Sequence, residues 1–483
     1  MQFGVVLRVL GILMMIFSFS VLPPAFIALY FHDGAWLPFL FSFSLAVLSG
    51  FVVWHPFRHC RRDLKIRDGF VVVILFWSVL SILGAIPFMI ADHPHQNFTD
   101  AVFESMSGLT TTGASVLSGI DYLPHAIKFY RQELQFLGGM GIIVLAVAVL
   151  PMLGIGGLQL YRAEIPGPAK DTKLTPRIKE TAKALWYIYV GLTVMCTLAY
   201  WASGMNVFDA IGESFGTIST GGFSMHDASF GYYQNPFIEM VAVIFMVLGS
   251  TNFSLHFLSL RYRGYAHYWE DQEFKLYICL LLGSTVITAI TLIAYHTYSH
   301  PSIAVSEAVF NAISLGTNTG FVSAPIQDWP TFLPLLLMMA AMIGGCAAST
   351  SGGVKVIRLL LLCKQGLREI KRLIHPNAVL PIKIGNKRVP ENIVEAVWGF
   401  IAIFVSLFVL FALVLMGAGL DLTTSFGALV ACFANAGVGI GDVATSFDGL
   451  NHVCKWVLIF AMLAGRLEIF TLLVIFTPAF WRR

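Results

Sequence analysis

Long, nearly uninterrupted apolar runs dominate the hydrophobic pattern of the chain. A helix needs about 20 apolar residues to cross a bilayer. Ten runs reach that length, and they lie at 4–31, 36–57, 69–91, 134–158, 184–204, 236–260, 274–297, 331–362, 391–417 and 453–478. The pattern therefore predicts ten membrane-spanning helices, joined by short polar segments.

Composition supports an integral membrane protein and excludes a water-soluble one. Of the 483 residues, 57% are hydrophobic and only 12% are charged, whereas a soluble domain carries about 25% charge. The first run is too long for a signal peptide, so it is expected to remain as the first span. Seven scattered cysteines, an odd number, predict no disulfide framework.

Basic residues gather in clusters that are separated by pairs of apolar runs. Arg8 stands near the start, and the clusters lie at 58–67, 162–183, 261–275, 355–388 and 482–483. The positive-inside rule places these clusters in the cytoplasm, which predicts a multi-pass inner-membrane protein with both termini cytoplasmic. The net charge of +3 reflects this asymmetry, and no nucleic-acid partner is expected. Four basic residues lie outside the clusters: Lys128, Arg131, Lys455 and Arg466.

Four related segments interrupt the pattern of spans. "DAVFESMSGLTTTGAS" (100–115) aligns with "DAIGESFGTISTGGFS" (209–224) and with "EAVFNAISLGTNTGFVS" (307–323), and "TSFGALVACFANAGVG" (424–439) is a weaker copy. The aligned glycines are Gly113, Gly222, Gly320 and Gly437. Internal repeats of this kind are common in transport proteins.

Each copy predicts a helix of about twelve residues followed by a loop of small residues. Such a helix is too short to span and suits a re-entrant segment. Asp100, Asp209 and Glu307 are expected at the helix starts, where a carboxylate suits the positive end of the dipole. Because a non-helical loop at membrane depth must be buried or line a water-filled path, four such loops are expected to meet on one axis.

The composition of the loops favours a monovalent cation. A ring of backbone carbonyls can replace the water shell of such an ion, and glycine adopts the required dihedral angles at little steric cost. The loops contain no Asp or Glu, which argues against a site for divalent ions. The negative ends of four short helices would favour a cation as well.

With these residues in view, the chain resembles the Trk/Ktr/HKT superfamily of potassium transport proteins, most closely its TrkH branch of bacterial membrane subunits. The resemblance covers the whole chain, and its most specific stretches are "SGLTTTGAS", "FYRQELQFLGGMGIIVLAVAVLP", "YRAEIPGP", "STGGFS", "HPNAV" and "GRLEIFTLLVIFTP". It implies an all-α integral membrane protein with four membrane–pore-loop–membrane repeats around a central, potassium-channel-like pore. It also implies an extra N-terminal helix pair, a homodimer and docking of TrkA, a cytosolic nucleotide-binding regulator.

The resemblance implies a domain division and a set of K⁺-binding residues. The expected parts are a transmembrane hairpin at 1–67 and repeats at 68–165, 180–262, 270–375 and 388–483. Carried over by position, the filter residues are Thr110, Thr111, Thr112, Gly113, Ser219, Thr220, Gly221, Gly222, Thr317, Asn318, Thr319, Gly320, Ala434, Asn435, Ala436 and Gly437.

Within that filter, the carbonyls of the second and third residue of each loop are expected to face the ion. In the plant branch of the superfamily, serine at the first glycine position accompanies sodium preference, so Gly113 favours potassium. The fourth loop departs most from the pattern because it lacks threonine and has Val438 where relatives commonly have proline.

A second candidate feature interrupts the 331–362 run. Glycine costs a helix roughly 1 kcal/mol per residue, so the four glycines of "GGCAASTSGG" predict a break in mid-membrane. The resemblance implies that this break is a gate below the filter, with Arg466 as its partner. Relatives usually have more glycine in this stretch, whereas this chain has Ala348 and Ser351 there. The gate residues are Gly344, Gly345, Cys346, Ala347, Ala348, Ser349, Thr350, Ser351, Gly352, Gly353 and Arg466.

Several structural interpretations compete with these assignments. The loops could be external turns, Gly344–Gly353 could be a small-residue packing face, and Arg466 could form a salt bridge with Glu133. Glu468 is two residues away from Arg466 and would not face it on a helix. "GESFG" (212–216) matches a hydrolase motif but has no preceding strand. The basic run at 355–388 is by default a cytoplasmic segment that contacts lipid, and TrkA docking there is implied only by the resemblance.

The expected function is potassium uptake through a selective, gated pore and not an enzymatic reaction. K⁺ is the only expected bound ion, and no phosphate-binding glycine loop for a nucleotide is present in the sequence. The main alternative is a symporter that couples K⁺ to H⁺ or Na⁺, with Glu133, Glu395 and Glu468 as the candidate proton carriers. A non-conducting regulatory or receptor subunit is a weaker alternative.

Overall fold

The fold is predominantly helical in the part of the chain that the structure covers. The computed structural model describes residues 2–60, 66–144, 178–262, 264–330, 332–385 and 387–482. Six of the described helices are long and apolar enough to cross a membrane, or up to eight if each of two bent pairs counts as one span. The remaining two predicted runs are 134–158, which is described only to residue 144, and 331–362, which is broken.

The first part of the chain forms an antiparallel helix pair. Its elements are α1 (Phe3–Ser18), η1 (Phe19–Val21), α2 (Leu22–Phe31), α3 (Trp36–Trp54) and η2 (His55–Phe57). Gly11 and Gly50 allow the two helices to touch, because a Cβ at either position would lie less than 3.0 Å from the carbonyl oxygen of the other. Small residues at a helix crossing are the usual solution inside a bilayer.

Four sets of elements follow, each with a short helix between longer ones. The first set is α4 (Ile66–Ile90), α5 (Phe98–Leu109), η3 (Ile120–Tyr122) and α6 (His125–Val144). The second is α9 (Ile178–Ala202), α10 (Val207–Ile218), η5 (Ser229–Tyr232), α11 (Pro236–Gly249), α12 (Phe253–Tyr262) and α13 (Ala266–Glu270).

The third and fourth sets repeat this order. The third is α14 (Gln272–Ala294), α15 (Pro301–Gly316), η6 (Ile326–Asp328), α16 (Phe332–Ile343) and α17 (Val356–Ile374). A two-residue antiparallel pair, β1 (Lys383–Ile384) with β2 (Lys387–Arg388), leads into the fourth set. That set is α18 (Glu391–Gly417), α19 (Leu422–Phe433), η7 (Gly441–Val443), α20 (His452–Arg466), α21 (Phe470–Phe476) and α22 (Pro478–Trp481).

The four sets close into a ring. Within each set, the short helix packs against the span before it: α4 with α5, α9 with α10, α14 with α15 and α18 with α19. Between sets, the later span packs against the next short helix: α6 with α10, α11 with α15, α16 with α19, and α20 back with α5. The short helices α5, α10 and α19 each have 12 residues and α15 has 16, so all four predicted short helices are present.

Two predicted uninterrupted spans are wrong. The 236–260 run bends by 93° between α11 and α12, and the 453–478 run bends by 115° between α20 and α21. The break at 344–353 was predicted from its glycines, and it separates α16 from α17. At the break at residues 250–252, hydroxyl groups and loop residues supply hydrogen bonds in place of those that the helix loses.

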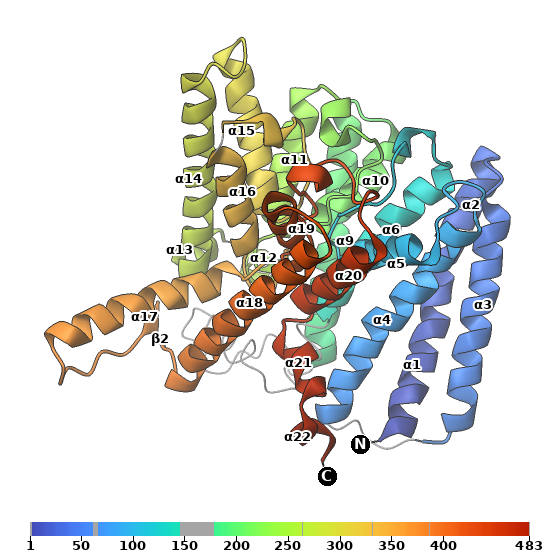
Figure 1. The fold of residues 1–483 in the computed structure, drawn as a ribbon, viewed down its shortest axis with the longest axis horizontal. Coiled ribbons are helices and arrows are strands. Elements are labelled where there is room, and N and C mark those ends of the chain that lie inside the picture. Colours follow the sequence, from blue (N-terminus) through green and yellow to red (C-terminus); the bar gives the residue numbers. More distant parts are fainter. Residues whose placement is uncertain are drawn as a thin grey trace.

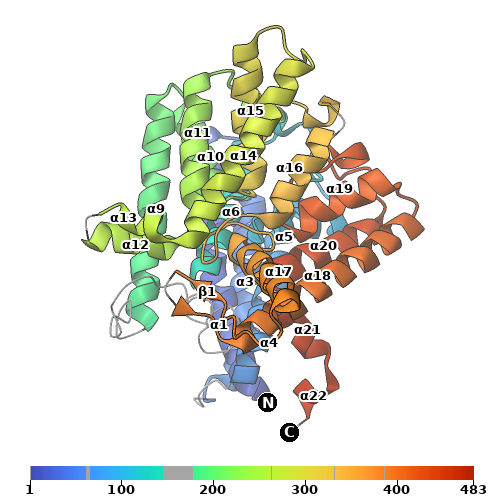
Figure 2. The ribbon, with the colours of Figure 1, turned by 90° about the vertical axis from the view of Figure 1, so that its left-hand side faces the viewer.

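The two ends of the chain lie together at one end of the molecule (Figure 1). After the break, α17 turns away from the bundle and projects from its side, as both views show (Figures 1 and 2). Residues 61–65 and 162–177, which belong to two of the predicted basic clusters, lie outside the described residues. The same holds for the C-terminal part of the 134–158 run and for the "YRAEIPGP" motif.

Candidate functional site

All four short helices end in the same turn. In each, the residue after the cap has a positive φ, between 50° and 62°, and the next amide bonds back five residues. This is the Schellman ending of a helix. The residues with positive φ are Thr111, Thr220, Asn318 and Asn435, and the bonds are Thr112 to Ser107, Gly221 to Gly216, Thr319 to Ser314 and Ala436 to Ala431.

The four loops meet in a closed ring of contacts. The last residue of each is a glycine with φ between 75° and 86°. A Cβ on any of these glycines would lie less than 3.0 Å from the carbonyl oxygen of the third residue of a neighbouring loop. The pairs are Gly113 with Gly221, Gly222 with Thr319, Gly320 with Ala436, and Gly437 with Thr112. The structure thus brings the four predicted loops together, as expected if they meet on one axis.

Most threonine hydroxyls of the loops are hydrogen-bonded within the protein, but the buried Oγ1 of Thr111 has no partner among the described residues. Thr110 and Thr112 pair with each other at 2.7 Å, and Thr317 and Thr319 pair at 2.8 Å. The side chain of Asn435 donates to Thr112 Oγ1 at 2.8 Å. Asn318 donates in the same way to the carbonyl of Ala434.. The threonine pairs lie within single loops, whereas the two asparagine bonds join the fourth loop to the first and third loops. The groups that remain for a ligand are the Thr111 hydroxyl and the loop carbonyls that accept no hydrogen bond from the protein.

Helix α6 holds the second loop through three side chains to which the sequence analysis assigned no role in the site. Gln135 Nε2 donates to the carbonyl of Gly221 at 2.6 Å, and its Oε1 accepts from the amide of Phe223 at 3.2 Å. Gln132 Nε2 donates to the Phe223 carbonyl at 2.7 Å, and Arg131 donates to the Ser224 carbonyl at 3.2 Å. All three side chains come from the "FYRQELQF" stretch.

A polar residue in the middle of three short helices holds the chain that leaves the loop. Glu104 accepts from the amide of Val116 at 3.0 Å, and Glu213 accepts from the amide of Met225 at 2.8 Å. Asn311 occupies the same position in α15 and accepts from the amide of Ser323 at 3.3 Å. The fully buried Glu104 also pairs with Arg131 at 2.8 Å. The repeat alignment contained this signal, because these three residues occupy one column.

The segment Gly344–Gly353 lies directly against three of the loops. Ser351 Oγ donates to the carbonyl of Thr317 at 2.9 Å, and the Gly353 amide donates to the carbonyl of Ala434 at 2.8 Å. Thr350 Oγ1 donates to the carbonyl of Ile218, directly before the second loop, at 2.9 Å. The segment is therefore a non-helical turn that packs against the loops. The alternative of a small-residue packing face on a helix is wrong.

The broken spans satisfy the backbone groups of each other. The Cys346 amide donates to the carbonyl of Ser250 at 3.0 Å, and the Phe253 amide donates to the carbonyl of Ala348 at 3.1 Å. The same Thr350 hydroxyl also lies 2.9 Å from the carbonyl oxygen of Gly249, so its single proton is shared between the carbonyls of Ile218 and Gly249. Freed backbone groups at membrane depth require such partners, which explains why the 236–260 run can bend there without a proline.

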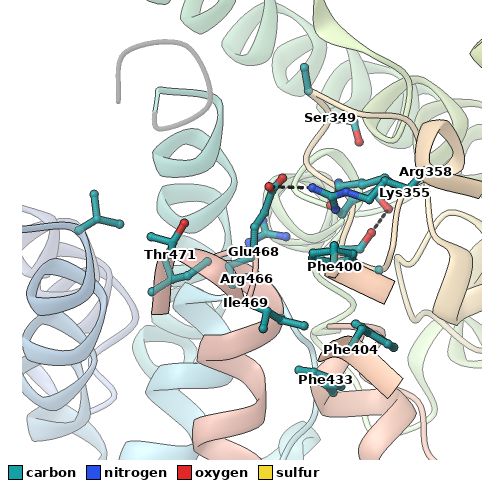
Figure 3. A pocket seen from close by; sticks show the side chains of 17 residues that line it. Ser349, Lys355, Arg358, Phe400, Phe404, Phe433, Arg466, Glu468, Ile469 and Thr471 are labelled. Carbon is teal, nitrogen blue, oxygen red and sulfur yellow. Dashed lines mark hydrogen bonds and ion pairs between the residues drawn. The ribbon is translucent and has the colours of Figure 1, made fainter. Parts of the chain in front are cut away.

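Three cationic side chains surround a small cavity of about 70 Å³ beside this segment (Figure 3). Arg466 Nη1 donates to the carbonyl of Thr350 at 2.9 Å. Lys355 donates to the carbonyl of Ser351, and Arg358 pairs with Glu468 at 2.7 Å. With one carboxylate for three cations, the cavity has a positive balance that opposes the entry of a cation.

The structure corrects the predicted surroundings of Arg466. It is the last residue of α20, at the 115° bend, and not a residue inside a continuous helix. In the described part of the chain no ion pair includes Arg466, so the salt bridge with Glu133 is absent. Glu133 is buried, and its Oε2 has no partner among the described residues.

Buried ion pairs and capping bonds fix the outer ends of the short helices. Asp100 pairs with Lys455 at 2.7 Å, and Asn97 and Asn206 cap α5 and α10. Asp100 and Asp209 do lie in the first turn of their helices. Glu307 does not, because α15 already begins at Pro301.

A histidine joins the first and second sets on the outer side of the loops. His226 lies between Asp121 and Asp209, hydrogen-bonded to both, and stacks on Tyr232 with the ring centroids 3.5 Å apart. Burial alone would lower the pKa of His226, but the hydrogen bonds to Asp209 and Asp121 outweigh it and raise the pKa above its ordinary value. Burial likewise opposes ionisation of Asp121, but its bonds to His226 and to the Asp227 amide leave the pKa of Asp121 lowered.

Comparisons with known proteins agree with this architecture. The chain matches the family described as "TrkH: Cation transport protein" over residues 39–483. It is 51% identical to the "Trk system potassium uptake protein TrkH" of Vibrio parahaemolyticus over 484 residues and 52% identical to the protein of that name in Escherichia coli over 482 residues. Both matches cover 100% of each chain. The crystal structure of the potassium transporter TrkH from Vibrio parahaemolyticus superposes with a TM-score of 0.93, at 48% identity and 100% coverage of both chains.

Proposed function

Because the chain belongs to the TrkH family of cation transport proteins, we propose that it carries out potassium uptake across the bacterial inner membrane. The observation that carries the proposal is the ring of four loops, in which each terminal glycine contacts a carbonyl of its neighbour. Relatives named as potassium uptake proteins match over their full length. Such a protein is a transporter and not an enzyme.

The sixteen loop residues form the proposed selectivity filter. Several of their side-chain hydroxyls and amides are bonded within the ring, so the backbone carbonyls that accept no protein hydrogen bond are the proposed oxygens that strip water from K⁺. Two of the expected carbonyls are already used, because Gly221 accepts from Gln135 and Ala436 accepts from the Val438 amide. Gly113 at the end of the first loop favours potassium over sodium. The ion is the cargo of the pathway and binds in transit.

The segment Gly344–Gly353, with Arg466, forms the proposed gate. Its support is the set of hydrogen bonds to the second, third and fourth loops and the positive balance of the adjoining cavity. Permeation requires the segment to leave the loops, because it occupies the space directly against them. Lys355, Arg358 and Glu468 join the predicted gate residues in this account.

Uptake needs no chemical energy from this chain. The inside-negative membrane potential supplies about 2.3 kcal/mol per elementary charge per 100 mV, which is enough to concentrate K⁺ inward. We propose that nucleotide effects arrive through a TrkA-type cytosolic regulator, and that the chain works as a homodimer with both termini in the cytoplasm. The proposed parts are the hairpin 1–67 and the repeats 68–165, 180–262, 270–375 and 388–483.

Growth tests the proposed function directly. The chain should restore growth of a potassium-uptake-deficient bacterium at limiting K⁺, and TrkA should modify the rescue. A matched strain that expresses an inserted chain with Gly113→Val should not grow, since the branched side chain would collide with the carbonyl of Gly221. Equal growth of the two strains at limiting K⁺ would contradict the proposal.

Coupled symport with H⁺ or Na⁺ gives a different electrical signature. Of its candidate proton carriers, Glu468 is paired with Arg358 and Glu395 lies in the second turn of α18, so Glu133 remains. A pore predicts a reversal potential at the potassium equilibrium potential, independent of pH and sodium. A symporter predicts a reversal potential that moves with the coupled ion.

A further inference from the structure

A second cavity lies on the lipid side of the third set of helices. It has a volume of about 250 Å³ and lies between α14 and α16. The part of α14 that lines it, residues 277–287, is the middle of a 23-residue span. A span of that length crosses the hydrocarbon core of about 30 Å, so the cavity lies at the level of the lipid chains and away from the head groups.

The cavity opens toward the bilayer through small residues. Gly283 and Ala340 lie at its mouth, and a Cβ on Gly283 would meet no atom within 4 Å. Two large apolar side chains that line the cavity, Ile287 and Met339, are also exposed on the surface of the protein. In a membrane, the medium that reaches this opening is hydrocarbon.

The wall of the cavity is mostly apolar and offers water few partners. Its two hydroxyl groups are already used: Tyr277 bonds to the hydroxyl of Ser250, and Ser284 donates to the carbonyl of Leu281 at 2.9 Å. A buried water needs two to four polar partners, whereas an apolar cavity of about 150 Å³ stays dry and accepts benzene. The larger cavity here therefore suits an apolar guest.

The inner end of the cavity touches both the filter and the gate. Gly316 is the last residue of α15, directly before Thr317, and Gly344 is the first residue of the gate segment. Tyr277 reaches the gate as well, because its partner Ser250 accepts a hydrogen bond from the Cys346 amide at 3.0 Å. Whatever fills the cavity packs against the start of the gate segment.

We propose that this cavity binds one hydrocarbon chain of a membrane lipid and that the bound chain supports the start of the gate segment. The second half rests on the proposed function, since it assumes that the gate segment controls flux. The first half concerns binding alone and stands independently of transport.

Photolabelling in proteoliposomes tests the binding. A phospholipid with a diazirine in the middle of its chain should label residues 277–287 and 336–344 of the wild-type protein. Ala340→Phe places a ring in the cavity and should abolish that labelling. Gly191→Phe is the matched control, since Gly191 lies on α9 with nothing within 4 Å of its Cβ and the variant should label like the wild type.

Two outcomes of the labelling would overturn the proposal. One is labelling of those segments that Ala340→Phe leaves unchanged. The other is an absence of labelling together with an oxidative disulfide between the exposed Cys279 residues of two subunits, which would show that a second copy covers the opening.

Flux measurements with altered lipids test the support of the gate. Methyl-branched chains are bulkier than straight chains and should fill the cavity less well, so rubidium flux through the wild type should differ between straight-chain and branched-chain vesicles. Ala340→Phe should remove the difference, and Gly191→Phe should keep it. Equal wild-type flux in both lipids would overturn the proposal that the bound chain supports the gate segment. An absence of flux in any lipid would count against the proposed function, and it would leave the labelling result intact.

Discussion

The residues that matter most for the ring are those whose backbone leaves the ordinary L-amino-acid regions. Two residues in each loop have positive φ, and only the last is always glycine. Thr111 and Thr220 hold this conformation as β-branched residues, for which it is a genuine outlier. Strain of this kind costs on the order of 1–3 kcal/mol per residue and persists only when the surroundings impose it.

Replacing Gly113 with Ser tests the filter at one position. A Cβ there would collide with the carbonyl of Gly221 at a φ of 86°, so the carbonyl must move out of the ring. We expect the K⁺ to Na⁺ permeability ratio to fall by about tenfold, which corresponds to about 1.4 kcal/mol of differential free energy. Bi-ionic reversal potentials in planar bilayers measure this ratio.

The matched control for this substitution is Gly119→Ser. Gly119 also has a positive φ, of 70°, but its Cβ would meet only Tyr122, at 3.9 Å. It carries the same backbone strain outside the ring, so the permeability ratio should stay at the wild-type value. If both variants kept that ratio, Gly113 would have no part in selection.

His226 predicts a pH dependence of stability. Its pKa is raised in the folded protein, so the stabilisation is fully present below the unfolded value of about 6.5 and is lost as pH rises through the folded pKa. The pKa of Asp121 is lowered, so its contribution is lost only in strong acid. The melting temperature of the wild type should therefore decrease as pH rises from about 6.5.

A histidine comparison isolates this effect. His226→Gln keeps a hydrogen-bonding side chain without titration, and its melting temperature should change less over the same pH range. His300→Gln removes an exposed histidine at the start of α15 and should follow the wild type. If the melting temperature of His226→Gln changed with pH in the same way as that of the wild type, His226 would have no role in the pH dependence of stability.

At the scale of elements, two kinds of break differ in how far the sequence predicts them. Gly344, Gly345, Gly352 and Gly353 signal the break between α16 and α17 by low helix propensity. The bends after Gly249 and Arg466 lack such a cluster of glycines. At the second bend the Ile469 amide bonds locally to the Ala464 carbonyl, whereas backbone groups at the first bend find partners in a segment distant in sequence, at Cys346 and Ala348. Predictions from local propensity cannot include such partners, and the same limit hid the contacts of Gln132 and Gln135.

The position of Arg466 at a helix end leads to a prediction for the gate. Arg466→Ala removes the donor to the Thr350 carbonyl and one positive charge from the cavity. A hydrogen bond from a charged group contributes about 1.5–3 kcal/mol, so the closed state should lose at least about tenfold in population relative to the open state. Rubidium flux into proteoliposomes should increase accordingly.

Two further variants make this result specific. Arg466→Lys keeps the charge but not the planar guanidinium, and its flux should lie between those of the wild type and Arg466→Ala. Arg372→Ala removes a half-exposed cation of α17 that pairs only with Glu369, and its flux should equal that of the wild type. Unchanged flux in a folded, inserted Arg466→Ala protein would remove Arg466 from the gate.

At the scale of the molecule, the four sets of helices depend on one another. Each later span packs on the short helix of the next set, and α20 closes the ring on α5. Lys128, Arg131, Lys455 and Arg466, which lie outside the basic clusters of the sequence, belong to this interior: all are buried, and Arg131 and Lys455 pair with carboxylates of α5. The repeat pattern predicted this ring because four similar segments of sequence form four similar structural units. It could not predict which buried charged side chains hold the units together.

A ring made from all four sets predicts that the transported ion stabilises the whole molecule. An ion bound only by the folded ring adds RT ln(1 + [K⁺]/Kd), or about 2.7 kcal/mol at a concentration one hundred times Kd. The melting temperature in detergent should therefore rise with K⁺ concentration, and it should rise less with Na⁺ at equal ionic strength. Gly113→Ser should lose the difference between the two ions, whereas Gly119→Ser should keep it. Equal stabilisation by K⁺, Na⁺ and choline would mean that the ring binds no ion at rest, because only bulk ionic strength would then act on the fold.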